Sequence, residues 1–118
     1  MGKLLLSIKK DIFIEAPTVL VARIVTNTSI GKGDSGYTAT SAKLAPVKIL
    51  RGPDRLSLTG KLEFHWCADY KPTVTAGKVY LLAMSGADIH AAIPLELGKE
   101  RTGVAVFYKQ IAEPDPWR

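Results

Sequence analysis

The chain has 118 residues, of which 23% are charged and 47% hydrophobic, and it contains a single cysteine. These values are typical of one globular domain, residues 1–118, that is large enough to bury a core, and they exclude a disordered tail. Cys67 alone excludes an intrachain disulfide, and no apolar run reaches the length of a membrane span. The apolar run before Lys9 is also too short for the core of a signal peptide.

The formal net charge of +5 is spread unevenly along the chain. Residues 1–61 carry ten Lys and Arg against four Asp and Glu, whereas residues 62–118 carry six against seven. A basic half can attract phosphate or an acidic surface. The basic residues lie singly apart from Lys9 and Lys10, so we expect any affinity for nucleic acid to be weak and unspecific.

The first expected element covers residues 7–15, S-I-K-K-D-I-F-I-E, which fit a short helix or a strand. Ser7 is a suitable N-cap and two isoleucines lie one helical turn apart, whereas isoleucine and phenylalanine also favour strands. Pro17 ends this element. The run Ala16–Thr28, A-P-T-V-L-V-A-R-I-V-T-N-T, is rich in β-branched residues and apolar on both faces, so it predicts a buried central strand.

A second long strand is expected over Tyr37–Leu50, after a flexible turn at residues 30–36. Pro46 interrupts this strand and predicts a bulge or sharp bend, after which the apolar residues of V-K-I-L return to the core. The R-G-P-D sequence at residues 51–54 is a turn signal, and we expect Gly52 to adopt a left-handed conformation there.

The second half of the chain is expected to add short strands. Leu62, Phe64 and Trp66 alternate with polar residues, so one face of their strand is apolar. The expected strands are residues 62–67, 79–84, 89–93 and 104–108, with a loop or one helical turn at 94–103 and an extended tail at 112–118. Five or six short strands, turn-rich joints and at most one or two short helices predict an all-β barrel or sandwich.

Three pieces of the sequence form an ordered pattern. They are V-A-R-I-V after an A-P-T start, V-K-I-L-R-G over Val47–Gly52, and G-K-V-Y-L-L-A over Gly77–Ala83, which follows Cys67. This pattern resembles the netrin-like, or tissue-inhibitor-of-metalloproteinases-like, domains, whose motifs are A-D-x-V-x-x-G-x-V, V-x-x-V-x-K-G, a cysteine and G-x-x-Y-L-V. The resemblance spans residues 12–93, mostly at core and turn positions, and implies a five- or six-stranded OB-like barrel.

The sequence departs from this family where its inhibitors contact their target. Their N-terminal Cys-x-Cys binds the protease zinc, whereas this chain begins Met1-Gly2-Lys3. The family disulfides need more than Cys67, and Arg23 stands where the family often has glycine. The resemblance therefore implies a non-catalytic interaction module of the kind found in exported bacterial and extracellular proteins, not a protease inhibitor. It implies a periplasmic or extracellular location if the precursor carries a signal peptide.

Three motifs that can carry chemistry lack the context that the chemistry needs. The G-x-G-x-x-G of residues 31–36 precedes a strand-like run, not the helix that a dinucleotide site requires. The run His65–Asp69 alternates possible metal ligands, with His90 as a fourth, but its spacing matches no zinc pattern. The S-x-x-K at residues 7–10 lacks companion motifs, and no base is placed to activate the cysteine. We therefore predict no enzyme activity, no cofactor and no metal.

A protein partner is expected to meet the loops at one end of the barrel, because binding residues concentrate on loops that a rigid scaffold holds. These loops are residues 30–37 and 68–77. The candidate partner-binding residues in and beside them are Lys32, Asp34, Tyr37, Tyr70 and Lys71. Nothing in the sequence names the partner itself.

The alternative is a domain that binds single-stranded nucleic acid, in which aromatic side chains of an OB barrel stack on bases in a basic groove. Trp66 separates the two hypotheses. If its indole fills the barrel, Trp66→Ala costs about 3–5 kcal/mol of stability. If it is an exposed stacking platform, the same change leaves stability within about 0.5 kcal/mol. The alternation of L-E-F-H-W-C favours the buried position.

Overall fold

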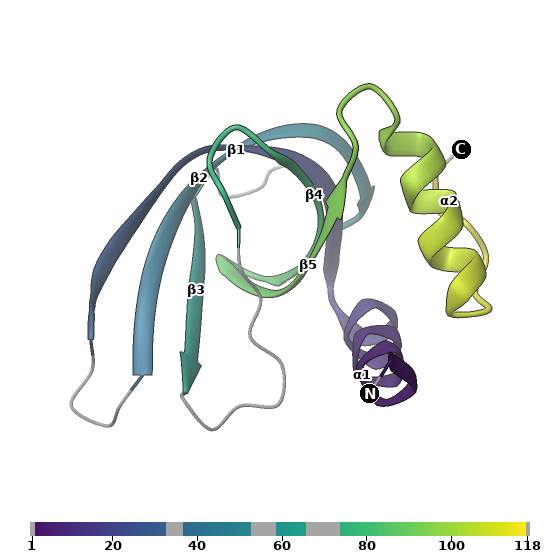
Figure 1. Cartoon of the computed structure of the whole chain (residues 1–118), viewed down its shortest axis with the longest axis horizontal. Helices are drawn as coiled ribbons and strands as arrows, with labels where there is room; N and C mark the ends of the chain where they lie inside the picture. The colour runs from purple at the N-terminus through teal and green to yellow at the C-terminus, as the bar shows by residue number, and fades with distance from the viewer. Residues whose placement is uncertain (1, 33–36, 53–58, 66–73, 118) are drawn as a thin grey trace.

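The computed structural model describes residues 2–32, 37–52, 59–65 and 74–117. Along the chain these residues form α1 (Gly2–Glu15), β1 (Thr18–Lys32), β2 (Tyr37–Arg51), β3 (Thr59–His65), β4 (Val79–Ser85), β5 (Asp88–Leu95) and α2 (Glu100–Gln110). The predicted mainly β class is confirmed. The strands form one curved sheet, and both helices lie beside β1, β4 and β5 (Figure 1).

The strands follow the order β1-β2-β3-β5-β4, and β1 pairs with β4 as well as with β2. The pairs are antiparallel except β3–β5, which is parallel and is joined by one residue pair, Lys61 with Asp88. By contrast, β1 and β2 pair along almost their whole length. The sheet is therefore continuous on both sides of β1, whereas the pairing between β3 and β5 is limited to a single residue pair.

The predicted central strand is β1, and it separates two hydrophobic cores. Leu20, Ala22 and Ile24 belong to an inner core with residues of β2, β4 and β5. Val19 and Val21 belong to an outer core, which also contains residues of both helices. The strand is apolar on both faces because each face is covered by a different layer of the protein.

The apolar run V-Y-L-L-A-M forms β4, as predicted, and all six of its residues are buried. They alternate between the two cores as those of β1 do. The inner core holds Tyr80, Leu82 and Met84, and the outer core holds Val79, Leu81 and Ala83. The short strand predicted at residues 89–93 is also present, within the longer β5.

A bulge interrupts β2 beside Pro46, as predicted. Ala22 of β1 lies opposite Pro46 and Val21 lies opposite Lys48, so Val47 is an extra residue in β2. The expectation that Val47 returns to the core is wrong, because its side chain is 52% exposed. The extra residue of a bulge does not follow the alternation of side chains along its strand, and here the side chain of Val47 is on the solvent side.

The end of β2 holds α1 against the sheet through Arg51. Its Nη1 atom donates hydrogen bonds to the carbonyl oxygens of Phe13, Ile14 and Ala16, at 2.9, 3.1 and 3.0 Å. Carbonyl groups at the C-terminal end of a helix lack partners within the helix and carry the negative end of its dipole, so a cation is favoured there. The helix predicted for residues 7–15 is confirmed over the strand alternative, although α1 already begins at Gly2.

Gly52 follows Arg51 with a φ of +123°, which confirms the predicted positive-φ backbone at this turn. The position also lies close to the start of β1. A Cβ at Gly52 would lie 2.9 Å from Oγ1 of Thr18 and 3.3 Å from the carbonyl oxygen of Pro17. Both the conformation and this close approach favour glycine here.

The prediction of a last strand at residues 104–108 is wrong, because these residues form the middle of α2. Val104, Phe107, Tyr108 and Ile111 are buried in the outer core at the three- and four-residue spacing of a helix face. The segment expected to be a loop or one helical turn, residues 94–103, contains the end of β5 at Leu95 and the first turn of α2 from Glu100. The V-A-V-F-Y run has the composition of a strand and the spacing of a helix.

The two helices and the chain end meet in the outer core. The ring centroids of Phe13 in α1 and Phe107 in α2 lie 4.9 Å apart in an edge-to-face arrangement. Residues 113–117 have no helix or strand, yet Trp117 packs against this core. The tail that is expected to be extended therefore has no regular secondary structure over these residues, and part of it lies against the domain.

Candidate binding face

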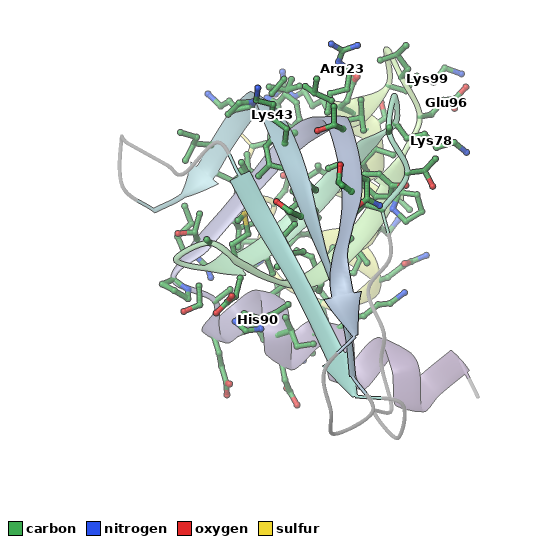
Figure 2. All side chains as sticks on the ribbon, turned by 90° about the vertical axis from the view of Figure 1, so that its left-hand side faces the viewer. Arg23, Lys43, Lys78, His90, Glu96 and Lys99 are labelled. Carbon is green, nitrogen blue, oxygen red and sulfur yellow. The ribbon has the colours of Figure 1, made fainter. Side chains whose placement is uncertain are left out.

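Four exposed basic residues lie on β1, on β2 and directly before β4, away from Arg51 at the end of β2. We call them the basic face: Arg23, Lys43, Lys48 and Lys78. Ala45 lies opposite Arg23 in the β1–β2 register, so Lys43 and Lys48 flank Arg23 diagonally on the neighbouring strand. Lys78 precedes Val79, which pairs with Arg23 from the other side. Figure 2 shows Arg23, Lys43 and Lys78 at the same end of the molecule.

Strand alternation explains why Arg23 and Lys43 reach solvent. Their immediate neighbours along each strand are buried in the inner core, and successive side chains of a strand point to opposite faces. These neighbours are Ala22, Ile24, Ala42 and Leu44. Arg23 and Lys43 therefore share the outer side of the sheet, next to the part of β1 around Val21 that packs against the helices.

The basic face lacks internal partners. Within the described part of the chain, none of its four side chains forms an ion pair or a hydrogen bond. The ion pair shown near it in Figure 2 joins Lys99 to Glu96 at 3.9 Å, and both of these side chains are highly exposed. Like charges on neighbouring strands repel one another. A bound carboxylate or phosphate would relieve that repulsion.

The backbone of Lys78 is fixed against β1. Ile24 donates its N–H to the carbonyl oxygen of Lys78 at 2.9 Å and accepts a hydrogen bond from the N–H of Gly77 at 2.7 Å. Nearby, Asn27 Nδ2 donates to the carbonyl oxygen of Val74 at 2.7 Å. The basic face is therefore carried by strands and by one anchored turn.

The structure places two of the five predicted partner-binding residues. Lys32 ends β1 and Tyr37 begins β2, so both lie at the end of the β1–β2 pair that is remote from Arg51. Asp34, Tyr70 and Lys71 lie outside the described residues. The basic face was missed from the sequence because its members are far apart along the chain. The available signal was that cations alternate with apolar residues inside predicted strands.

Of the possible metal ligands that the sequence analysis considered and rejected, the structure describes only the two histidines. Cys67 and Asp69 lie outside the described residues, and His65 is the last residue of β3. His90 lines one pocket together with Glu15 at the end of α1, and Figure 2 shows His90 over this helix. In the part of the chain that the structure describes, no three His, Cys, Asp or Glu side chains form a group that could hold a metal ion.

Two other predicted features fall largely outside the described residues. Of the G-x-G-x-x-G glycines only Gly31 is described. It lies in β1 and pairs with Ala39 of β2. Trp66, which separates the two functional hypotheses, is not among the described residues. The expectation of a buried indole therefore stays a prediction.

A cavity of about 300 Å³ lies between α1, the end of β2 and the segment after α2. Tyr108 lines it, and its buried hydroxyl has no partner among the described residues. Burial raises the pKa of Tyr108, Arg51 lowers it in part and Asp115 raises it further, so the hydroxyl is a neutral donor. The cavity suits an anion poorly, because Arg51 already binds the α1 carbonyls and Glu113 and Asp115 are both close.

No protein-family model matches this sequence, and no curated protein matches it either. In the described part of the chain, neither helix has the length and apolar character needed to cross a membrane. The basic face combines positive charge, exposure and a fixed backbone.

Proposed function

We propose that this protein is a non-catalytic interaction module that binds an acidic partner protein through the basic face. The observation that carries this proposal is the group of exposed cations around Arg23, which lack partners among the described residues. Strands hold these positions before any partner arrives, so little backbone freedom is lost on binding. A cationic surface of this kind selects acidic partners and accelerates their association.

The proposal includes an OB-like barrel related to the netrin-like domains. The order β1-β2-β3-β5-β4, with β1 also paired to β4 and with β3 parallel to β5, supports a five-stranded, partly open Greek-key barrel. Two of the sequence pieces that resemble the family lie in β1 and β4, which are neighbours in the sheet. This adjacency supports the resemblance, since the shared residues then form one structural unit.

Reversal of single charges tests the basic face, with fluorescently labelled polyglutamate as the probe. Arg23→Glu and Lys43→Glu should each weaken binding about tenfold, because each replaces an attraction by a repulsion. Arg101→Glu is the matched control, since Arg101 is exposed on α2 and the change in net charge is the same. Anisotropy titrations at low and physiological salt provide the dissociation constants, and affinity should fall as salt rises. Equal losses in all three variants would contradict a localised face.

A second candidate function, binding of single-stranded nucleic acid, is favoured by one feature of the β2–β3 pair. OB folds use the face of their second and third strands for oligonucleotides. Tyr37 lies opposite His65 in the register of this pair. Stacking of a base on an aromatic side chain contributes about 1–3 kcal/mol. If this function holds, Tyr37→Ala weakens oligothymidine binding and leaves polyglutamate binding unchanged.

A further inference from the structure

Two exposed aliphatic side chains lie among the cations of the basic face. Val25 is 42% exposed and Val47 is 52% exposed. Val47 adjoins Lys48 in β2 and is the extra residue of that bulge. Val25 lies two residues after Arg23 in β1. It has no partner in β2, because Ile24 pairs with Leu44 and Thr26 pairs with the next residue, Lys43. Cations and valines therefore interleave on the same two paired strands.

Val25 and Val47 each lie in an exposed part of their strand, and each is the unmatched residue of a bulge. A bulge gives one strand a residue that the partner strand does not match, and that residue leaves the alternation. On both strands the residues beside the bulge remain in the ladder. Apolar area left in water costs about 25 cal/mol per Å². An aliphatic side chain of a partner would remove that area from water.

The chemistry of these exposed residues favours a polypeptide over a nucleic acid. In the described part of the chain, the large hydrophobic side chains that are exposed are all aliphatic: Ile14, Val25, Val47, Leu97 and Val106. Single-stranded nucleic acids gain affinity from phosphate contacts and from stacking on aromatic rings. Valine supplies neither, whereas it packs well against leucine, isoleucine or valine of another chain.

We propose, on the basis of the interaction module described above, that the basic face binds an extended acidic segment of a protein that carries aliphatic side chains between its carboxylates. An extended segment presents every second side chain on one face. The carboxylates of the partner then contact the cations of the basic face, and its aliphatic side chains contact the two valines. The Arg23 guanidinium donates two parallel hydrogen bonds to one carboxylate. The partner's aliphatic side chains cover Val25 and Val47.

Two labelled peptides of equal length and equal charge test this inference. One repeats Glu-Ser-Val-Ser and the other repeats Glu-Ser-Ser-Ser, so that only the aliphatic groups differ. We expect the unmodified protein to bind the valine peptide about tenfold more tightly. The double variant Val25→Ser/Val47→Ser should lose this preference and keep its affinity for the serine peptide. Val106→Ser is the matched control, because Val106 is 51% exposed on α2, and it should keep the preference.

The outcomes separate this inference from the proposed function. Equal affinity of the unmodified protein for the two peptides would overturn the aliphatic preference and leave charge recognition standing. Arg23→Glu should weaken the binding of both peptides, and unchanged affinities in that variant would overturn the interaction surface itself. Tighter binding of oligothymidine than of either peptide at the same salt would overturn both in favour of nucleic acid. Circular dichroism before each titration shows whether every variant is folded.

Discussion

Gly52 combines two constraints at one residue, a positive φ and a close approach to Thr18. Gly52→Val should lower the free energy of unfolding by about 1–3 kcal/mol through backbone strain, and by more where the new side chain meets Thr18. Gly98→Val is the control, because Gly98 has a φ of +85° and open space around it. Urea denaturation of both variants measures the two effects. Equal losses would show that Thr18 moves aside without cost.

Tyr108 provides a second test at the scale of one side chain, because its buried hydroxyl lacks a partner among the described residues. Tyr108→Phe removes the hydroxyl and keeps the ring, so stability at neutral pH should be unchanged or higher by about 1 kcal/mol. Tyr80→Phe is the control, since the Tyr80 hydroxyl accepts a hydrogen bond from the N–H of Thr75 at 2.8 Å. Thermal unfolding should show a loss of stability in the control. A loss of equal size in Tyr108→Phe would mean that its hydroxyl is hydrogen-bonded in solution.

The same tyrosine predicts how stability depends on alkaline pH. Burial raises the pKa of Tyr108 above its ordinary value of 10.0, which applies in the unfolded chain. The folded state therefore keeps a proton that the unfolded state loses, and the unfolded state is favoured as the proton leaves. The contribution of this group to stability is complete below about pH 10 and falls as pH rises above it. Tyr108→Phe should show a smaller alkaline decline than the unmodified protein.

At the scale of an element, α2 shows that spacing and composition can disagree. Val104 and Val106 lie on the same face of a strand, but they lie on nearly opposite faces of a helix. Val104 is fully buried, whereas Val106 is 51% exposed. Val104→Ala should destabilise the protein by about 2 kcal/mol, and Val106→Ala should stabilise it by about 0.5 kcal/mol through helix propensity. Equal effects of the two changes in urea denaturation would support the strand that composition favours.

The elements that could be predicted are those in which period and composition agree. β1 and β4 are long, β-branched and apolar on both faces, and a strand covered on both sides needs that composition. Pro46 predicted the bulge beside it, because proline has no N–H to donate to a hydrogen bond between strands. The run V-A-V-F-Y was misassigned because β-branched and aromatic residues dominate it, whereas Ile111 completes a helical spacing beyond its end.

At the scale of the whole molecule, the mainly β class followed from the sequence and the basic face did not. The face exists because Arg23 of β1 pairs opposite Ala45 of β2 and beside Val79 of β4. That arrangement depends on a register with several bulges, and a slip by one residue would turn Lys43 toward the inner core. The local sequence pattern predicts which side chains alternate within a strand, but it does not determine the register between two strands.

The pairing of β1 with β4 also governs when the protein can first become compact during synthesis. The ribosome delivers β1 and β2 well before β4 and β5, yet the inner core needs all four strands. Contacts between distant parts of a chain form slowly, and unpaired apolar strands associate with one another in the interval. The nascent chain is therefore most prone to aggregate before β5, which ends at Leu95, has emerged. A chaperone that shields β1 at this stage would raise the yield of folded protein.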